Sequence, residues 1–483
     1  MNLGLIVPEL SVLVGAIIVI LLNLFSSDKR WLYVVSLIGL AVAGGFTISY
    51  WGGDRQVIFN NMLAIDQFAL FFKFLFLSIA TLVVLASVKY TLKFQFRGEY
   101  LALVLISTLG MMLMASATEL LSLFVSLELT SLSLYTLVCF LKNQKSTESA
   151  LKYFLLGAIS SAIFLYGIIF VYGFTGTTQL GEIAVAIQNN VSVNSTGSIG
   201  LLLGIVLVIT GLGFKISAFP FQMWVPDVYE GAPTPITAYL SVASKAAGFA
   251  VVLRIFHSAF SLPVWLSNDW GMAFAIVAVV GMTAGNIWAI PQVNIKRMLA
   301  YSSIAQAGYL MLGLATMGFA EQADVQGQIG VLFFLVGYTA TNLGAFFSVI
   351  AISETIESDD IADFAGMGKR ATLPALALSF CLISLIGIPP TVGFMAKFYL
   401  FSAAVQQNLL WPVIIAVINS VISAYYYLRV VRIMWLNEAK LEGTTPTSTA
   451  LIVAILISVL LVLFLGVAPN FMMRLAEIAA KMF

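Results

Sequence analysis

The chain has 483 residues, of which 61% are hydrophobic and only 9% charged, and its formal net charge is +1. Soluble domains carry about 25% charged residues, so this composition excludes an ordinary soluble protein and is typical of a polytopic membrane protein. A net charge this close to zero gives no reason to expect a nucleic-acid partner.

The hydrophobic stretches predict an all-α membrane protein with about fourteen transmembrane helices. The first stretch, 5–25, is long enough to cross a bilayer, which takes about 20 apolar residues. It has no basic leader and no small-residue cleavage site, so we expect a retained helix rather than a signal peptide. The predicted spans are 4–25, 31–51, 67–92, 100–116, 118–141, 149–174, 198–225, 234–257, 270–291, 294–317, 326–353, 371–404, 410–433 and 448–468.

The predicted spans fall into four regions. Residues 1–97 hold three helices, 98–260 a first set of five, 268–436 a second set of five, and 437–483 the C-terminal helix and tail. Because five is odd, the second set would enter the membrane from the opposite side. In each set the fourth helix is broken by proline, at Pro220 in one and at Pro389–Pro390 in the other. Matched broken helices indicate two inverted repeats.

The basic residues between the spans predict the orientation. Loops rich in Lys and Arg stay on the cytoplasmic side, so both termini are predicted to face outward. The basic residues on the predicted cytoplasmic side are Lys29, Arg30, Lys89, Lys93, Arg97, Lys142, Lys145, Lys152, Lys296, Arg297, Lys369, Arg370, Arg429, Arg432 and Lys440. Those on or near the opposite side are Arg55, Lys73, Arg254, Arg474 and Lys481.

Two long loops fit this orientation. The stretch 176–197 is polar and poor in charge, as expected of an outer loop, whereas 354–370 is strongly hydrophilic and is predicted to run along the cytoplasmic surface. The acidic residues of 354–370 form either a solvated face or a docking surface for a neighbouring subunit.

Four charged residues lie well inside predicted spans, namely Glu128, Lys215, Lys245 and Lys397. Glu128 is about ten residues into its helix, which is ~15 Å deep at 1.5 Å per residue. A charge at the bilayer centre costs at least ~2.5–3.5 kcal/mol, so each needs a partner, water or neutralisation. Snorkelling or a structural ion pair is the alternative to a functional role. Snorkelling fits Lys245 poorly because of its depth and is harder to exclude for Lys215.

A proton path is the chemistry that such residues suit. Burial lowers the pKa of a lysine and a nearby carboxylate raises it, so a buried lysine between these effects can exchange a proton near neutral pH. In the stretch GFKISAFPFQMW (213–224), Pro220 follows Lys215 by five residues. The proline frees a backbone carbonyl one turn earlier, where water or a side chain can bind. The nearby residues Ser217, Ser241 and Ser244 allow either water or close packing.

Other polar residues support weaker predictions. Lys152 and Tyr153 are predicted to be interfacial anchors, while His257 lies at a helix end, as either a path residue or an interfacial one. A water path and helix–helix hydrogen bonds are equal alternatives for Tyr301, Ser302, Ser303 and Gln306. The run Tyr425–Tyr427 predicts aromatic packing.

Cofactor and metal motifs are absent from the sequence. The single histidine excludes a histidine-cluster metal site, and Cys139 and Cys381 are predicted to be inert packing residues. The sequence contains no P-loop, no Rossmann fingerprint, no paired CxxC motifs and no nucleophile elbow.

At three places the sequence resembles a known family, the antiporter-like membrane subunits of respiratory complex I, and most closely subunit N of the NADH–quinone oxidoreductases. The run FKISAFPFQMWVPDVYEGAPTPITAYLSVASKAAGF (214–249) carries the resemblance, and NIKRMLAYSSIAQAGY (294–309) and GIPPTVGFMAKFYLF (387–401) support it. The resemblance implies fourteen helices with two inverted five-helix repeats. It also implies an ion pair between Glu128 and Lys215, a central relay at Lys245 and an outward-leading relay at Lys397. Many relatives have histidine where this chain has Gln222, so no titrating role is expected there.

The sequence therefore predicts a proton-translocating membrane-arm subunit of a complex I-type quinone oxidoreductase, in a bacterial inner membrane or a thylakoid-type membrane. The resemblance implies other membrane-arm subunits as partners. It also implies that quinone, flavin and iron–sulfur clusters belong to other subunits, so no cofactor is expected in this chain. Two alternatives stay open, a cation/proton antiporter subunit of the multi-subunit sodium type and a structural membrane subunit that does not pump.

Overall fold

A computed structural model describes residues 3–26, 28–190, 196–261, 264–319, 325–439 and 447–481. Lys440 and parts of the loop 176–197 and of the region 437–483 lie outside these residues. The α-helices are α1 (Val7–Phe25), α2 (Arg30–Ser49), α3 (Gln67–Tyr90), α4 (Arg97–Ser116), α5 (Leu120–Val138), α6 (Gln144–Thr175), α7 (Leu180–Asn190), α8 (Thr196–Ile216), α9 (Trp224–Gly231), α10 (Thr234–Tyr239), α11 (Lys245–Ser258), α12 (Val264–Ala289), α13 (Ile295–Phe319), α14 (Gln326–Ile356), α15 (Met367–Arg370), α16 (Thr372–Ile386), α17 (Val392–Gln406), α18 (Leu410–Leu436), α19 (Thr449–Val467) and α20 (Asn470–Ala480).

The remaining elements are short. Four are 3₁₀ turns, at Leu3–Ile6, Thr91–Lys93, Cys139–Leu141 and Ile361–Phe364, and one is a π-helical segment, η4, at Leu240–Ser244. The strands β1 (Gln56–Ile58) and β2 (Leu63–Ile65) pair antiparallel in a small hairpin that the sequence analysis did not predict.

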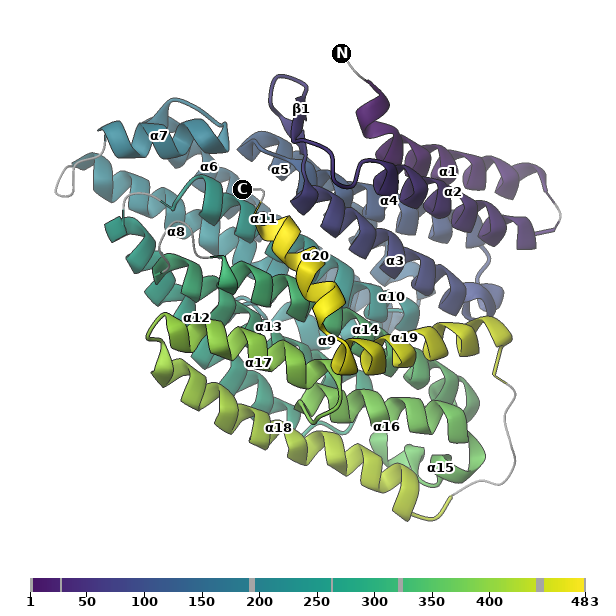
Figure 1. The fold of residues 1–483 in the computed structure, drawn as a ribbon. Coiled ribbons are helices and arrows are strands. Elements are labelled where there is room, and N and C mark those ends of the chain that lie inside the picture. The colour runs from purple at the N-terminus through teal and green to yellow at the C-terminus, as the bar shows by residue number, and fades with distance from the viewer. Residues whose placement is uncertain are drawn as a thin grey trace.

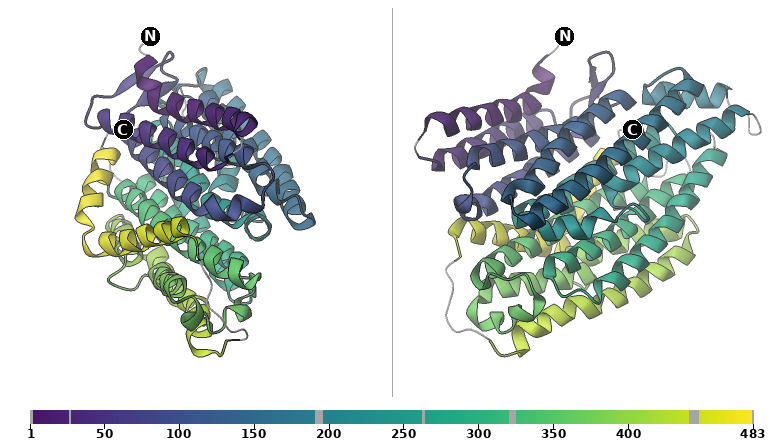
Figure 2. Two further views of the ribbon diagram at one scale, coloured as in Figure 1. Left: turned by 90° about the vertical axis from the view of Figure 1, so that its right-hand side faces the viewer. Right: turned by 180° about the vertical axis from the view of Figure 1, so that it is seen from behind.

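The predicted number of spans is confirmed. In the described part, thirteen helical segments are long and apolar enough to cross a membrane, and α16 and α17 are shorter apolar helices that occupy the remaining predicted span, 371–404. A backbone in hydrocarbon must satisfy its hydrogen bonds internally, which explains why nearly all of this apolar sequence is helical. The long helices run roughly parallel in one bundle, with the N-terminal helices at one edge and α18 at the other (Figures 1 and 2).

Both predicted helix breaks are present, with different boundaries from those predicted. The span 198–225 ends early as α8 at Ile216, where Ser217 takes a left-handed backbone with φ of +61°, and the chain resumes as α9. The span 371–404 divides into α16 and α17, and Gly387 is left-handed with φ of +94°. The span 234–257 contains an unpredicted irregularity, because η4 separates α10 from α11.

The loop elements agree with the predicted alternation of the spans. The hairpin and α7, which lie in predicted outer loops, are found at one end of the bundle, and α15, in the predicted cytoplasmic loop 354–370, is at the opposite end (Figure 1). That loop is more ordered than predicted. The carbonyl of Asp359 accepts a hydrogen bond from the backbone of Ile295, the first residue of α13, and Asp360 pairs with Asn294 in an antiparallel bridge. The amphipathic helix α20 crosses the bundle and packs on α3 and α14 (Figure 1).

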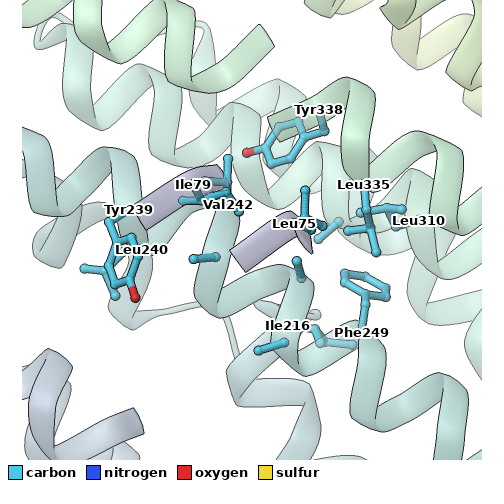
Figure 3. Close-up of a cluster of buried hydrophobic side chains, with 14 of the residues drawn as sticks. Leu75, Ile79, Ile216, Tyr239, Leu240, Val242, Phe249, Leu310, Leu335 and Tyr338 are labelled. Atoms are coloured by element: carbon cyan, nitrogen blue, oxygen red, sulfur yellow. The ribbon is translucent and has the colours of Figure 1, made fainter. Parts of the chain in front are cut away.

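The centre of the bundle is a continuous apolar core around η4. Leu75 and Ile79 of α3, Val242 of η4, and Leu310 and Leu335 of α13 and α14 are all buried there. Figure 3 shows how these side chains converge from different helices. Burying a large aliphatic side chain is worth roughly 1.5–3 kcal/mol. The polar residues of this region are therefore held in rigid apolar surroundings.

Candidate functional site

Lys215 lies in the last turn of α8, directly before the helix break, and its side chain is buried. Its ammonium donates a hydrogen bond of 2.5 Å to the hydroxyl of Ser131 on α5. The break exposes the carbonyl of Phe214, which accepts a 3.0 Å hydrogen bond from the indole of Trp224. A side chain from α9 therefore binds the backbone next to the break, at a carbonyl six residues before Pro220 and not at the one a single turn earlier that the sequence analysis expected.

Glu128 lies on α5 one turn before Ser131, on the same face of the helix. Its carboxylate accepts a hydrogen bond from Ser161 of α6, and the side chain is half-buried. No ion pair within 4.0 Å joins Glu128 to Lys215 in the structure, so the direct pair that the resemblance implies is not formed here. The reason is local, since Lys215 reaches Ser131 instead.

Lys245 directly follows the π-helical segment η4 and is 1% exposed. Its ammonium donates to both the hydroxyl and the carbonyl of Ser303 on α13, each at 2.5 Å. The ring of Tyr338 lies 5.6 Å from the ammonium. Such π-helical turns often occur at functional sites. Ser303 therefore takes part in hydrogen bonds between helices, which is one of the two alternatives that the sequence analysis left open.

Lys397 lies on α17 and is buried. Its ammonium donates to the carbonyls of Leu385 and Ile386 at 3.1 and 2.9 Å, and to the hydroxyl of Ser420 at 3.0 Å. These carbonyls end the half-helix α16, where backbone acceptors are unsatisfied and the helix dipole favours a cation. The Tyr309 ring centroid is 4.6 Å from the ammonium.

One face of α13 connects Lys245 with Lys397. Gln306 lies one turn after Ser303 on this face and donates a 3.3 Å hydrogen bond to the carbonyl of Leu385, which also accepts from Lys397. Tyr309 follows at the same spacing. The sequence analysis missed Tyr309 as a site residue, and the three-residue spacing from Ser303 was the signal for it.

The other residues considered in the sequence have simpler environments. Ser302 shares a 2.5 Å hydrogen bond with Tyr427, so this part of the tyrosine run does more than pack. Tyr153 is fully buried and stacks on Trp224, which is inconsistent with an interfacial anchor. Lys152 is exposed and pairs with Asp227 at 2.9 Å. His257 lies within 3.4 Å of Gln328.

The candidate lysines differ from the other deeply buried basic residues of the described part. Three further basic side chains are as well buried, although the sequence analysis placed none of them well inside a span, and each has a carboxylate partner. These pairs are Lys73–Glu9 at 2.7 Å, Arg254–Asp66 at 2.9 Å and Lys296–Asp359 at 3.3 Å. The described residues provide no carboxylate within 4.0 Å of Lys215, Lys245 or Lys397, whose ammonium groups contact only hydroxyls, carbonyls and rings.

Two cavities open at the two ends of the bundle. One, of about 670 Å³, is lined by four basic residues of the predicted cytoplasmic side, Lys89, Lys93, Lys145 and Lys296, together with several acidic residues. The other, of about 780 Å³, is lined by residues of the predicted outer side, including Arg55, Asp66, Glu182 and Arg254. Lys215, Lys245 and Lys397 are not among the lining residues of either cavity.

Among the described residues, no group of three or more His, Cys, Asp or Glu side chains could hold a metal ion. Cys139 and Cys381 are both free thiols.

Comparison with known proteins gives consistent matches along the whole chain. The family model described as NADH:quinone oxidoreductase/Mrp antiporter, membrane part, matches residues 117–423. NADH-quinone oxidoreductase subunit N of Dehalococcoides mccartyi is 49% identical, and the match covers 99% of each chain. Subunit N of Trichlorobacter lovleyi is 43% identical, and the match covers 100% of this chain and 97% of the relative.

Three solved structures have the same overall fold. A chain of respiratory complex I from Thermus thermophilus superposes with a TM-score of 0.81 at 31% identity, over 97% of this chain and 98% of its own. A chain of an archaeal membrane-bound sulfane sulfur reductase has a TM-score of 0.88 at 26% identity, over 99% of this chain and 97% of its own. A chain of the Mrp complex from Dietzia has a TM-score of 0.85 at 20% identity, which shows the fold alone, over 100% of this chain and 97% of its own.

Proposed function

The chain belongs to the family of NADH:quinone oxidoreductase and Mrp antiporter membrane subunits, as a subunit N, and we propose that it moves protons through Glu128, Lys215, Lys245 and Lys397. It is an antiporter-like membrane-arm subunit of a complex I-type quinone oxidoreductase. Electron transfer takes place in other subunits under this proposal, and this chain contributes the proton path without binding flavin, quinone or an iron–sulfur cluster itself.

The observation that carries the proposal is the environment of the three lysines. A buried lysine with a carboxylate partner is held charged, because losing its proton leaves a buried carboxylate unpaired. Lys215, Lys245 and Lys397 have only neutral partners in the described part of the chain. Hydroxyls can accept or donate, so they can bind both the ammonium and the neutral amine. This environment suits a group that gains and loses a proton.

The polar row on α13 supports transfer between the second and third lysines. Ser303 binds Lys245, and Gln306 shares the Leu385 carbonyl with Lys397. The buried hydroxyls of Tyr135, Tyr153 and Tyr338 make no hydrogen bond of ordinary geometry within the described residues, which is the pattern expected where water molecules complete a polar path.

The basic loops give the orientation of the chain under this proposal. We infer that the chain lies in a bacterial inner membrane or a thylakoid-type membrane, with both termini outside. The cavity lined by Lys89, Lys93, Lys145 and Lys296 would then face the side of proton uptake, and the cavity around Arg254 the side of release. Other membrane-arm subunits would surround the chain, with lipid on its remaining apolar faces.

The alternative of a sodium-type antiporter subunit has less support, because the likeness to the Mrp complex is one of fold at 20% identity. The experiment described next distinguishes the proposal from the alternative of a structural subunit that does not pump.

The deciding experiment replaces Lys245 by alanine in the assembled complex in sealed vesicles. Quinone reduction and proton uptake are recorded together, with a check of assembly. The proposal predicts loss of both activities in an intact complex. Full pumping with normal quinone reduction would make Lys245 structural and favour the non-pumping alternative.

A further inference from the structure

The short helix α9 lies between two of the candidate lysine sites. At its first residue, Trp224 donates its indole hydrogen to the carbonyl of Phe214, the residue before Lys215. The same indole stacks on Tyr153 with ring centroids 4.5 Å apart and an interplanar angle of 16°. One end of α9 is therefore fixed to the backbone that carries Lys215.

The other end of α9 contacts the site of Lys245. The hydroxyl of Tyr229 shares a 3.3 Å hydrogen bond with the hydroxyl of Ser303, the group that binds the Lys245 ammonium. The carbonyl of Tyr229 accepts a 2.9 Å hydrogen bond from Thr237 of α10. A displacement of α9 would therefore change the contacts of both lysine sites.

The helix α9 also carries two partly exposed carboxylates, which an ion-pair network holds in place. Arg297 of α13 donates from one guanidinium nitrogen to Asp227 at 2.7 Å and to Glu230 at 3.0 Å. Lys152 of α6 pairs with Asp227 at 2.9 Å, and Lys145 of α6 pairs with Glu230 at 2.8 Å. Arg297 binds both carboxylates, and it comes from the second set of helices, whereas both lysines come from the first.

The lysines are not equivalent to Arg297 in this network. Lys145 and Lys152 are 59% and 45% exposed, and exposed ion pairs contribute little and hold their partners loosely. Arg297 is 31% exposed, and it lies on the same helix as Ser303, six residues earlier. It therefore fixes α9 relative to the helix that binds Lys245.

We propose that Arg297 is a positioning residue for proton transfer. It holds α9 against α13, so that a change at Lys215 is passed through Trp224 and Tyr229 to the Ser303 that binds Lys245. This proposal rests on the proposed function and adds the physical connection between its first and second lysines. Arg297 itself does not carry the proton.

The test is Arg297→Gln in the assembled complex in sealed vesicles, with protons translocated per quinone reduced as the deciding quantity. The ratio is expected to fall by about twofold or more, the lower end of effects on coupling between sites. Arg297→Lys, which keeps the charge, should restore much of it. Lys142→Gln removes an exposed charge at the same face without a contact to α9 and is the matched control.

If the assembled Arg297→Gln complex translocates as many protons per quinone as wild type, the proposal is overturned. This holds even if less of the complex assembles. If that variant does not assemble, Asp227→Asn removes one of the two contacts of Arg297 and is judged by the same ratio. Lys245→Ala measured in parallel separates the two ideas. Loss of pumping in Lys245→Ala with a normal ratio in Arg297→Gln would refute only the role of Arg297, whereas full pumping in Lys245→Ala would refute the proton path itself.

Discussion

Lys397 and Gln306 donate to the same carbonyl oxygen, that of Leu385, at 3.1 and 3.3 Å. The two donors come from α17 and α13, and the acceptor lies in the last turn of α16. Because the backbone acceptors at a helix end lack intrahelical donors, this oxygen is free to bind both. The protonation state of Lys397 is thereby linked to the position of a side chain one turn from Ser303.

Replacing Gln306 by leucine tests this link. Leucine keeps much of the volume but removes the donor, and one lost hydrogen bond of about 1 kcal/mol corresponds to roughly a fivefold effect on an equilibrium. We expect the protons translocated per quinone reduced to fall several-fold in sealed vesicles. Gln406→Leu, at an exposed position at the end of α17, is the control and should behave as wild type. Normal pumping in Gln306→Leu would show that Lys245 and Lys397 are connected by another route.

Ser131 provides a second test, because it is the acceptor for the Lys215 ammonium at 2.5 Å. Ser131→Ala leaves that buried ammonium without its hydroxyl partner, which costs about 1–3 kcal/mol. We expect proton pumping to fall about tenfold, with Ser131→Thr restoring it because the hydroxyl returns. Ser133→Ala on the same helix removes a hydroxyl bound only to its own helix at Leu129, and this variant should pump normally. Equal pumping by the two alanine variants would contradict a role for Ser131.

The spans and the buried lysines could be predicted from the sequence because hydropathy is a property of consecutive residues. A run of about 20 apolar residues predicts a span, and a lysine within it stands out without knowledge of its neighbours. The breaks at Pro220 and Pro389 were predicted because a proline inside an apolar run interrupts the helix. Their exact positions were not, since the helices end where Ser217 and Gly387 take left-handed conformations.

The partners of the buried residues could not be predicted, because they depend on contacts between distant helices. Glu9 and Lys73 are 64 residues apart, and Asp66 and Arg254 are 188 apart, yet both pairs are buried. The helix α9 shows the same limit. The predicted spans 198–225 and 234–257 left most of its residues in the segment between them, and the contacts of Trp224 and Tyr229 appear only in the folded chain.

The position of Lys397 next to its carbonyl acceptors depends on close contact between α16 and α17. A side-chain carbon added at Gly393 would lie 1.8 Å from the carbonyl oxygen of Ser384, which is part of the backbone and cannot rotate away. Overpacking typically costs about 1–3 kcal/mol, so Gly393→Ala should separate the half-helices and move Lys397 from its carbonyl acceptors. We expect lower assembly and reduced pumping in the complex that forms. Gly44→Ala meets no atom within 4 Å and should assemble normally. Equal assembly and pumping by both variants would show that α17 can shift without consequence.

The ion-pair network of α9 predicts an acid-sensitive contribution to stability. Burial raises the pKa of Asp227, but hydrogen bonds and charge from Lys152 and Arg297 outweigh it and leave the pKa of this carboxyl below its usual value. Burial likewise raises the pKa of Glu230, and Lys145 and Arg297 lower it further than burial raises it. A carboxyl with a lowered pKa in the folded state stabilises that state above its unfolded pKa, about 3.9 for Asp and 4.3 for Glu, and the contribution disappears as the pH falls through the folded value.

We therefore expect the melting temperature at which this subunit leaves the detergent-solubilised complex to fall between about pH 4.5 and pH 3. The double variant Asp227→Asn/Glu230→Gln should have a lower melting temperature than wild type at neutral pH. Its melting temperature should also fall less as the pH is lowered, because neither amide titrates. Partial exposure of both carboxylates, at 31% and 21%, keeps the expected difference small. Asp28→Asn, in an exposed loop, is the control for a general loss of negative charge. If the melting temperatures of wild type and double variant fell equally across this pH range, the network would not stabilise α9. Protonation of Asp227 and Glu230 would then leave the folded state unaffected.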